Sequence, residues 1–122
     1  MANYKTLNAW KLAMQLVKEV YIVTKKYPKE ELFALTFQTK RSAVSIPSNI
    51  AEGLGRQYKK DTLQFLYISR GSIYELETQL NIAGMINVIF EDELRSLLIS
   101  LESTLKVLNG LINSFETRTD LK

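Results

Sequence analysis

The residues of this chain that could do chemistry are few, because histidine and cysteine are both absent. Without them there is no disulfide, thiolate zinc site, cysteine nucleophile or side chain that exchanges protons readily at neutral pH. Carboxylates remain, and Glu52, Glu75 and Glu77 are the set that could hold a magnesium ion for a nuclease. Glu75 and Glu77 are two positions apart, however, so on a helix they point to different faces. We therefore expect no enzyme, no catalytic residue, no metal and no cofactor.

The segment 41–56 mixes polar and charged side chains with a proline inside an otherwise apolar helical pattern. Asn49 lies three positions before Glu52, and Arg56 lies four positions after it, so the three can share one helix face. A later segment places small and acidic residues beside Gly71, where two backbones could approach closely. One of two arginines is expected to pair with Glu52 or with a glutamate of that later segment, in a network whose role is structural. The residues predicted for this network are Arg41, Asn49, Glu52, Arg56, Ser72 and Glu75.

Positive charge is concentrated in the first half of the chain. Residues 1–61 contain eleven Lys or Arg and five Asp or Glu, whereas residues 62–122 contain five and eight, so the net charges are +6 and −3. A basic half suggests an anionic partner such as nucleic acid, and an unevenly charged but purely solvated surface is the alternative. The candidates for phosphate contacts are Lys11, Lys18, Lys25, Lys26, Lys40, Arg41, Arg56, Lys59 and Lys60.

Four helices are expected to position these residues, because only five glycines and two prolines are available for turns. The first should cover 7–26 and the second 29–54, with an interruption and kink at Pro47. The third should cover 60–83, and the fourth should have the acidic residues 91–93 at its N-terminal end. Glycine caps are expected at Gly53 and Gly55 after the second helix and at Gly84 after the third. The sequence thus predicts one domain over 1–122, an all-α, antiparallel up-down-up-down four-helix bundle.

The spacing of apolar residues predicts which face of each helix is buried. The inward stripe of the first helix is predicted to be Leu7, Trp10, Met14, Val17, Tyr21 and Thr24. That of the third is Leu66, Ser69, Ile73, Leu76, Leu80 and Ala83, and that of the fourth is Leu94, Leu98, Leu101, Leu105, Leu108, Ile112 and Phe115. Further apolar residues lie off these stripes, namely Ala13, Leu16, Val20, Val23, Leu97, Val107 and Leu111. Because one core needs one stripe per helix, this surplus favours burial against another subunit.

A family resemblance is carried by the run Ser-Ile-Pro-Ser-Asn-Ile-Ala-Glu-Gly at residues 45–53, followed by Arg56. A second block contains Gly71-Ser72 and the run Glu-Leu-Glu-Thr at residues 75–78. Together they closely resemble the signature of the four-helix proteins encoded within intervening sequences of bacterial large-subunit ribosomal RNA genes. Ala34 departs from the family, which often has Gly there, and 39–41 reads Thr-Lys-Arg in place of a Gln-Arg-Arg-like step.

This resemblance implies an antiparallel four-helix bundle, assembled in several members as a ring of five. The chain is also similar to the accessory proteins of diversity-generating retroelements, which are basic pentamers that bind nucleic acid and a reverse transcriptase. Family membership is a strong statement about fold and a weak one about function.

Two functional hypotheses follow. The leading one is a homo-oligomeric bundle, a pentamer by resemblance, that binds RNA or DNA through phosphate contacts with little sequence specificity. Tyr58, Tyr67 and Tyr74 could stack on bases, although packing is the commoner role of such residues. The alternative is a protein-interaction adaptor or scaffold ring with a protein partner and no direct nucleic-acid role. The start of the chain is unlike a secretory signal and no apolar run is long enough for a membrane span, so we expect a cytoplasmic protein without membrane contact.

Overall fold

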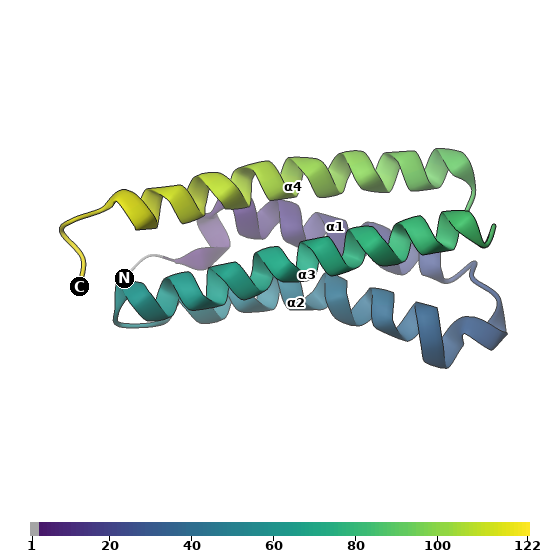
Figure 1. Ribbon diagram of the computed structural model, residues 1–122, viewed down its shortest axis with the longest axis horizontal. Coiled ribbons are helices and arrows are strands. Elements are labelled where there is room, and N and C mark those ends of the chain that lie inside the picture. Colours follow the sequence, from purple (N-terminus) through teal and green to yellow (C-terminus); the bar gives the residue numbers. More distant parts are fainter. Residues whose placement is uncertain (1–2) are drawn as a thin grey trace.

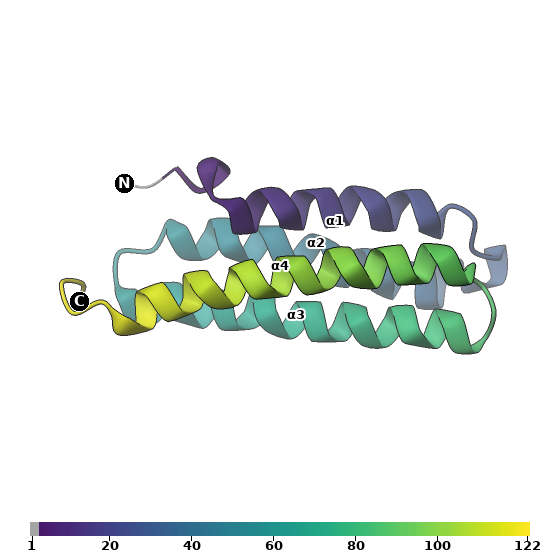
Figure 2. The ribbon, with the colours of Figure 1, turned by 90° about the horizontal axis from the view of Figure 1, so that it is seen from above.

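The computed structural model describes residues 3–122, and these fold into four long helices. They are α1 (Asn8–Thr24), α2 (Phe37–Leu54), α3 (Lys59–Met85) and α4 (Glu91–Thr117), with a short 3₁₀ turn, η1 (Tyr4–Thr6), before α1. Each helix packs against its neighbours in the chain, and α4 packs against α1. Figure 1 and Figure 2 show the four helices side by side along the long axis of the molecule. The prediction of an all-α four-helix bundle is confirmed.

The two ends of the bundle are built differently (Figure 1). The turn η1, the C-terminus and the connection from α2 to α3 lie at one end, and the connections α1–α2 and α3–α4 lie at the other. The α1–α2 connection contains a 3₁₀ turn, η2 (Lys29–Glu31), and a π-helical turn, η3 (Leu32–Thr36). The second helix therefore begins eight residues later than predicted. It then continues through Pro47 without interruption, and the kink at that residue stays a prediction.

The predicted inward face of α1 was wrong except at Thr24, which is buried. Leu16 and Val20 are fully buried, whereas Met14 keeps 44% of its surface exposed and Tyr21 keeps 39%. Ala13 and Val23 are also in the core, so the residues set aside for a subunit interface line the inside of this chain instead. Two apolar stripes run along α1, and spacing alone does not say which one faces inward. The stripe of small and aliphatic residues fits between the other helices, while the larger amphipathic side chains stay at the boundary.

The inward face of α3 was predicted correctly, since all six of its residues are buried. On α4 the prediction was right for Leu101, Leu108 and Ile112 but missed Leu97 and Thr104, which are also buried. The other predicted residues of α4, namely Leu94, Leu98, Leu105 and Phe115, are only partly buried at the edges of the core. The buried seam of α4 is therefore rotated slightly from the predicted one.

The prediction that α2 ends at a glycine was right at Gly55, which follows Leu54 as the cap and donates its amide to the Glu52 carbonyl at 3.2 Å. The left-handed conformation expected of the glycine caps was wrong, because Gly55 has φ −86° and no glycine among the described residues has a positive φ angle. The cap predicted at Gly84 was also wrong, because Gly84 lies within α3. After α3 the left-handed residue is Asn87, with φ 61°. Its amide donates to the Gly84 carbonyl at 3.2 Å and the next amide, of Val88, donates to the Ala83 carbonyl at 3.0 Å, which is the Schellman pattern. Asparagine is the residue that takes this conformation most readily after glycine.

Glycine is instead used where helices come close. A β-carbon added at Gly53 would lie 2.9 Å from Phe65 Cβ and 3.1 Å from the Thr62 carbonyl oxygen on α3. Gly71, where a close approach was predicted, has open space around it. The close contact between α2 and α3 thus occurs at Gly53, and the prediction at Gly71 was wrong.

Candidate nucleic-acid interface

A row of lysines runs along the outside of α1. Lys11, Lys18 and Lys25 are exposed and repeat every seven residues, on the side of the helix opposite buried Leu16 and Val20. Seven residues of α-helix rise about 10.5 Å, so the row extends over about 21 Å. None of the three makes an ion pair with any residue from 3 to 122. We call this row the basic crest.

The basic crest ends at a small hollow that three lysines share. Lys25, Lys29 and Lys40 all line it, and its volume is about 160 Å³. They come from three places, the end of α1, the turn η2 and the first turn of α2. The Lys40 ammonium also lies 4.8 Å from the centre of the Tyr21 ring, which holds this side chain against α1. We call this hollow the basic niche, and the crest and niche together the basic face.

Lys29 was not predicted as a site residue. Its neighbours in the sequence, Pro28 and Glu30, mark it only as part of a turn. The signal that could have found it is the helix break itself, because a turn between two antiparallel helices brings its residues close to the ends of both.

Besides Lys40, three predicted phosphate-binding residues make contacts within the chain. Lys26 pairs with Glu93 of α4 at 2.6 Å. Arg56 lies 3.7 Å from Glu52, one turn earlier on the same helix, and its guanidinium lies 4.5 Å from the centre of the Phe65 ring on α3. Such contacts leave these cations less free to meet a phosphate than those of the basic crest.

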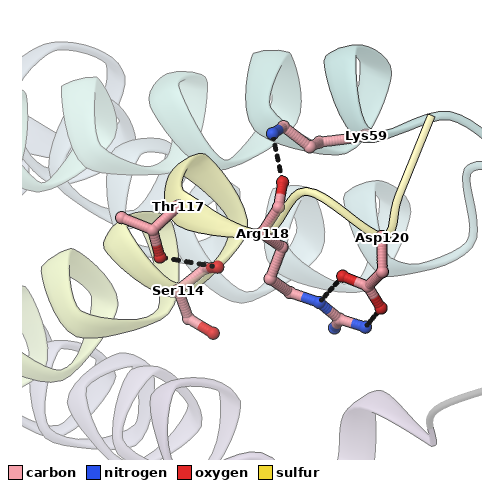
Figure 3. A network of polar contacts seen from close by, with 5 residues as sticks. All are labelled: Lys59, Ser114, Thr117, Arg118 and Asp120. Carbon is pink, nitrogen blue, oxygen red and sulfur yellow. Dashed lines mark hydrogen bonds and ion pairs between the residues drawn. The ribbon is translucent and has the colours of Figure 1, made fainter.

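Lys59 is the third, and it closes the end of α4 (Figure 3). Its ammonium donates to the carbonyl of Arg118 at 2.7 Å, and its backbone amide donates to the carbonyl of Lys122 at 3.1 Å. Arg118 in turn binds Asp120 with two hydrogen bonds, which lowers the pKa of that carboxyl. A lysine at the carbonyl end of a helix satisfies groups that have no partner inside it. Lys59 therefore has a structural role, and Lys60 beside it is exposed.

The predicted polar network has a different composition in the structure. The contact between α2 and α3 is made by serines, since the Ser72 hydroxyl donates to Ser45 Oγ at 2.8 Å and Ser69 donates to the Ile46 carbonyl at 2.8 Å. The Asn49 amide also donates to Ser45 Oγ, at 2.9 Å. The Glu52 ion pair stays on the surface of α2. No ion pair involving Arg41 or Glu75 occurs among the described residues, and these two line a groove described below.

The three tyrosines predicted to be able to stack on bases differ in how free their side chains are. Tyr58 and Tyr74 are about half exposed, whereas the Tyr67 hydroxyl bonds to the Glu116 carboxylate, which raises the pKa of Tyr67. Tyr27 is only 7% exposed, and its hydroxyl has no hydrogen-bond partner among residues 3–122. Burial, together with the negative charge of Glu93, raises the pKa of Tyr27 to about 12.

The described residues offer little to other classes of function. No group of three or more acidic side chains among residues 3–122 is placed to hold a metal ion. Across the same residues, every helix is too short or too polar to cross a bilayer.

Comparisons with known proteins agree with this architecture. The sequence profile of the 23S rRNA-intervening sequence protein family matches residues 5–110. No curated protein matches the chain. Among solved structures, a protein of unknown function from the S23 ribosomal protein family of Bacteroides thetaiotaomicron VPI-5482 is similar, with 22% sequence identity and a TM-score of 0.80. The match covers 86% of this chain and 95% of that one, and it shows a shared fold.

Proposed function

The chain belongs to the 23S rRNA-intervening sequence protein family, and we propose that it is a non-enzymatic helical bundle that binds RNA or DNA through its basic face. The observation that carries this proposal is the basic crest. It presents three exposed lysines without ion-pair partners in the described chain, in one straight row that leads into the basic niche. A row of free ammonium groups is suited to the repeating negative charge of a nucleic-acid backbone.

Binding through this face should depend little on sequence. Lysine contacts to phosphate fix position and orientation but carry no information about the bases. The crest also lies along the exposed side of one helix of the bundle, rather than on an element that projects into a major groove.

We further propose that the protein forms a homo-oligomer, a ring of five by resemblance to its family. Five of the seven residues that suggested self-association are in the core, and Val107 and Leu111 are partly buried against it, so the proposal depends on other apolar side chains. Trp10, Met14, Val17 and Val44 line a mostly apolar groove of about 310 Å³ between α1 and α2. Burial of this groove between subunits would remove their apolar surface from water.

A scaffold without a nucleic-acid role is the second candidate. Its support is the exposure of Met85 (80%) and Phe90 (73%) at the end of the bundle that contains the α3–α4 connection. A protein partner that covered these two side chains would remove their apolar surface from water.

The test compares two double variants that remove equal charge. Lys11→Gln with Lys18→Gln removes two residues of the basic crest, and Arg95→Gln with Lys106→Gln removes two exposed cations of α4. We expect the first to weaken binding of a fluorescent RNA, measured by anisotropy at about 50 mM salt, by ten-fold or more, and the second to weaken it much less. Equal losses would show that only net charge matters, and absence of binding by the unmodified protein would favour the scaffold.

A further inference from the structure

A polar groove lies between α2 and α3, on the other side of the π-helical turn from the basic niche. Its volume is about 730 Å³, within the range of about 300–1,000 Å³ that small-molecule sites occupy. Seven of its ten lining residues are polar, and they include the serine of α3 that joins the two helices. The groove is therefore not an apolar surface awaiting burial in a core.

Two polar groups of this groove are left without partners. Gln79 is partly buried, and its side-chain Oε1 is inaccessible to water and accepts no hydrogen bond within the described chain. Arg41 is exposed at the groove and makes no ion pair with residues 3–122. Leaving an acceptor such as Gln79 Oε1 unsatisfied costs free energy, and a ligand with an N–H donor would recover it once the Gln79 side chain rotates toward the groove. Glu75, also in the lining, supplies a second acceptor.

Two aromatic rings form one wall of the groove. Phe33 is 90% exposed and Phe37 is 53% exposed, which is far more than aromatic side chains of a stable core retain. They are four residues apart, so they follow one another along the same side of the turn. The residues just before each of them, Leu32 and Thr36, line the basic niche. One side of this turn thus faces three lysines, and the other faces the aromatic groove.

We propose that the groove binds an unpaired base of single-stranded nucleic acid, stacked on Phe33 and Phe37, while the adjoining backbone contacts Arg41 and the basic niche. A base has a flat aromatic surface for the rings, amine donors for Gln79 and Glu75, and acceptors for Arg41. Because residues adjacent in the sequence line the groove and the niche, we expect one strand to reach both sites. This inference depends on the proposed function and adds to it a preference for unpaired over paired nucleotides.

The chemistry of the groove favours a nucleotide over a second copy of the chain. A helix docked here would have to remove water from Arg41 and Glu75 without offering a matched partner for each. A nucleotide leaves its phosphates and these charged groups partly in water, so this desolvation is smaller.

The experiment measures the affinity of the full-length protein for two labelled RNAs of about 12 residues. One is a single-stranded oligocytidylate, whose bases carry the exocyclic amine that the groove should recognise, and the other is a blunt duplex of matched length. Phe33→Ala should weaken binding of the single strand about ten-fold, as expected for loss of one stacked base, and leave duplex binding unchanged. Gln79→Leu should also weaken binding of the single strand alone.

The matched control is Phe90→Ala, since Phe90 is 73% exposed at the same end of the bundle but lines no part of the groove. It should change neither affinity. Because Phe33 is nearly fully exposed, its removal takes no packing from the core, and loss of folding does not confuse the result.

Three results would overturn the inference. If Phe33→Ala leaves both affinities unchanged while variants of the basic crest lower both, the protein binds backbone without a base site and the proposed function survives. If Phe33→Ala changes the oligomer measured by sedimentation velocity and not the affinity for RNA, a second copy occupies the groove. If neither RNA binds the unmodified protein, the proposed function fails together with the inference.

Discussion

Replacement of Gly53 by alanine should destabilise the bundle, although alanine is the better helix former. In an open helix interior this change would raise stability by about 1 kcal/mol. At Gly53, however, the new methyl group would lie 2.9 Å from Phe65 Cβ and 3.1 Å from the Thr62 carbonyl oxygen. Both atoms belong to or adjoin the backbone of α3, so neither can rotate away and the helices must separate. Overpacking of this kind typically costs about 1–3 kcal/mol, and we expect a net loss of about 1 kcal/mol.

Gly71→Ala is the matched control, because it places the same methyl group on α3 where no other atom lies within 4 Å. We expect Gly71→Ala to raise the free energy of unfolding by about 1 kcal/mol. The free energies of unfolding of the two variants should then differ by about 2 kcal/mol. Urea unfolding followed by circular dichroism measures both, at one protein concentration because self-association would make stability depend on it. A Gly53→Ala protein as stable as Gly71→Ala would refute the close contact between α2 and α3.

Three further predictions concern buried groups. The pKa of Tyr27 is raised from 10 to about 12, so the stability due to its neutral hydroxyl is complete below pH 10 and is lost as the pH rises to 12. The free energy of unfolding of Tyr27→Phe, measured with urea at several pH values, should therefore rise relative to that of the unmodified protein by up to about 3 kcal/mol between pH 9 and 12. If the difference between the two proteins stays constant over this range, the burial of this hydroxyl is contradicted. Ser69→Ala should lower the free energy of unfolding by about 1 kcal/mol, since it removes the bond to the Ile46 carbonyl, and an unchanged urea midpoint would argue against that bond. Gly84→Ala should lower the melting temperature, because its methyl group would meet Leu94 Cδ2 at 2.7 Å, and it should do so less than Gly53→Ala because a leucine tip can move.

The fold could be predicted from the sequence because local signals agree with one another along most of the chain. The spacing of apolar residues on α3 gave its buried face correctly, from Leu66 to Ala83. On α1 the same reasoning failed, since a helix with two apolar stripes has two faces of similar hydrophobicity. The choice between Leu16 and Met14 is made by how well each fits against the other three helices, and a single helix does not contain that information.

The site was predictable in part for a similar reason. The even spacing of Lys11, Lys18 and Lys25 follows from the helix alone, and the structure places all three on the outside. Lys59, in contrast, contacts Arg118, which is far away in the sequence. Lys29 lies beside Lys25 and Lys40 because the turn between α1 and α2 brings the three lysines to one hollow. Contacts of this kind depend on tertiary structure, so composition and spacing did not reveal them.

The central claim, that the basic face binds nucleic-acid backbone, is tested most directly by the salt dependence of RNA binding. The logarithm of the affinity for a single-stranded RNA should fall linearly with the logarithm of the salt concentration, by about 0.7 for each phosphate contact. Replacing Lys11, Lys18 and Lys25 together by Gln should reduce that slope by about 2. An unchanged slope in this variant, or no binding by the unmodified protein at about 50 mM salt, would contradict the claim.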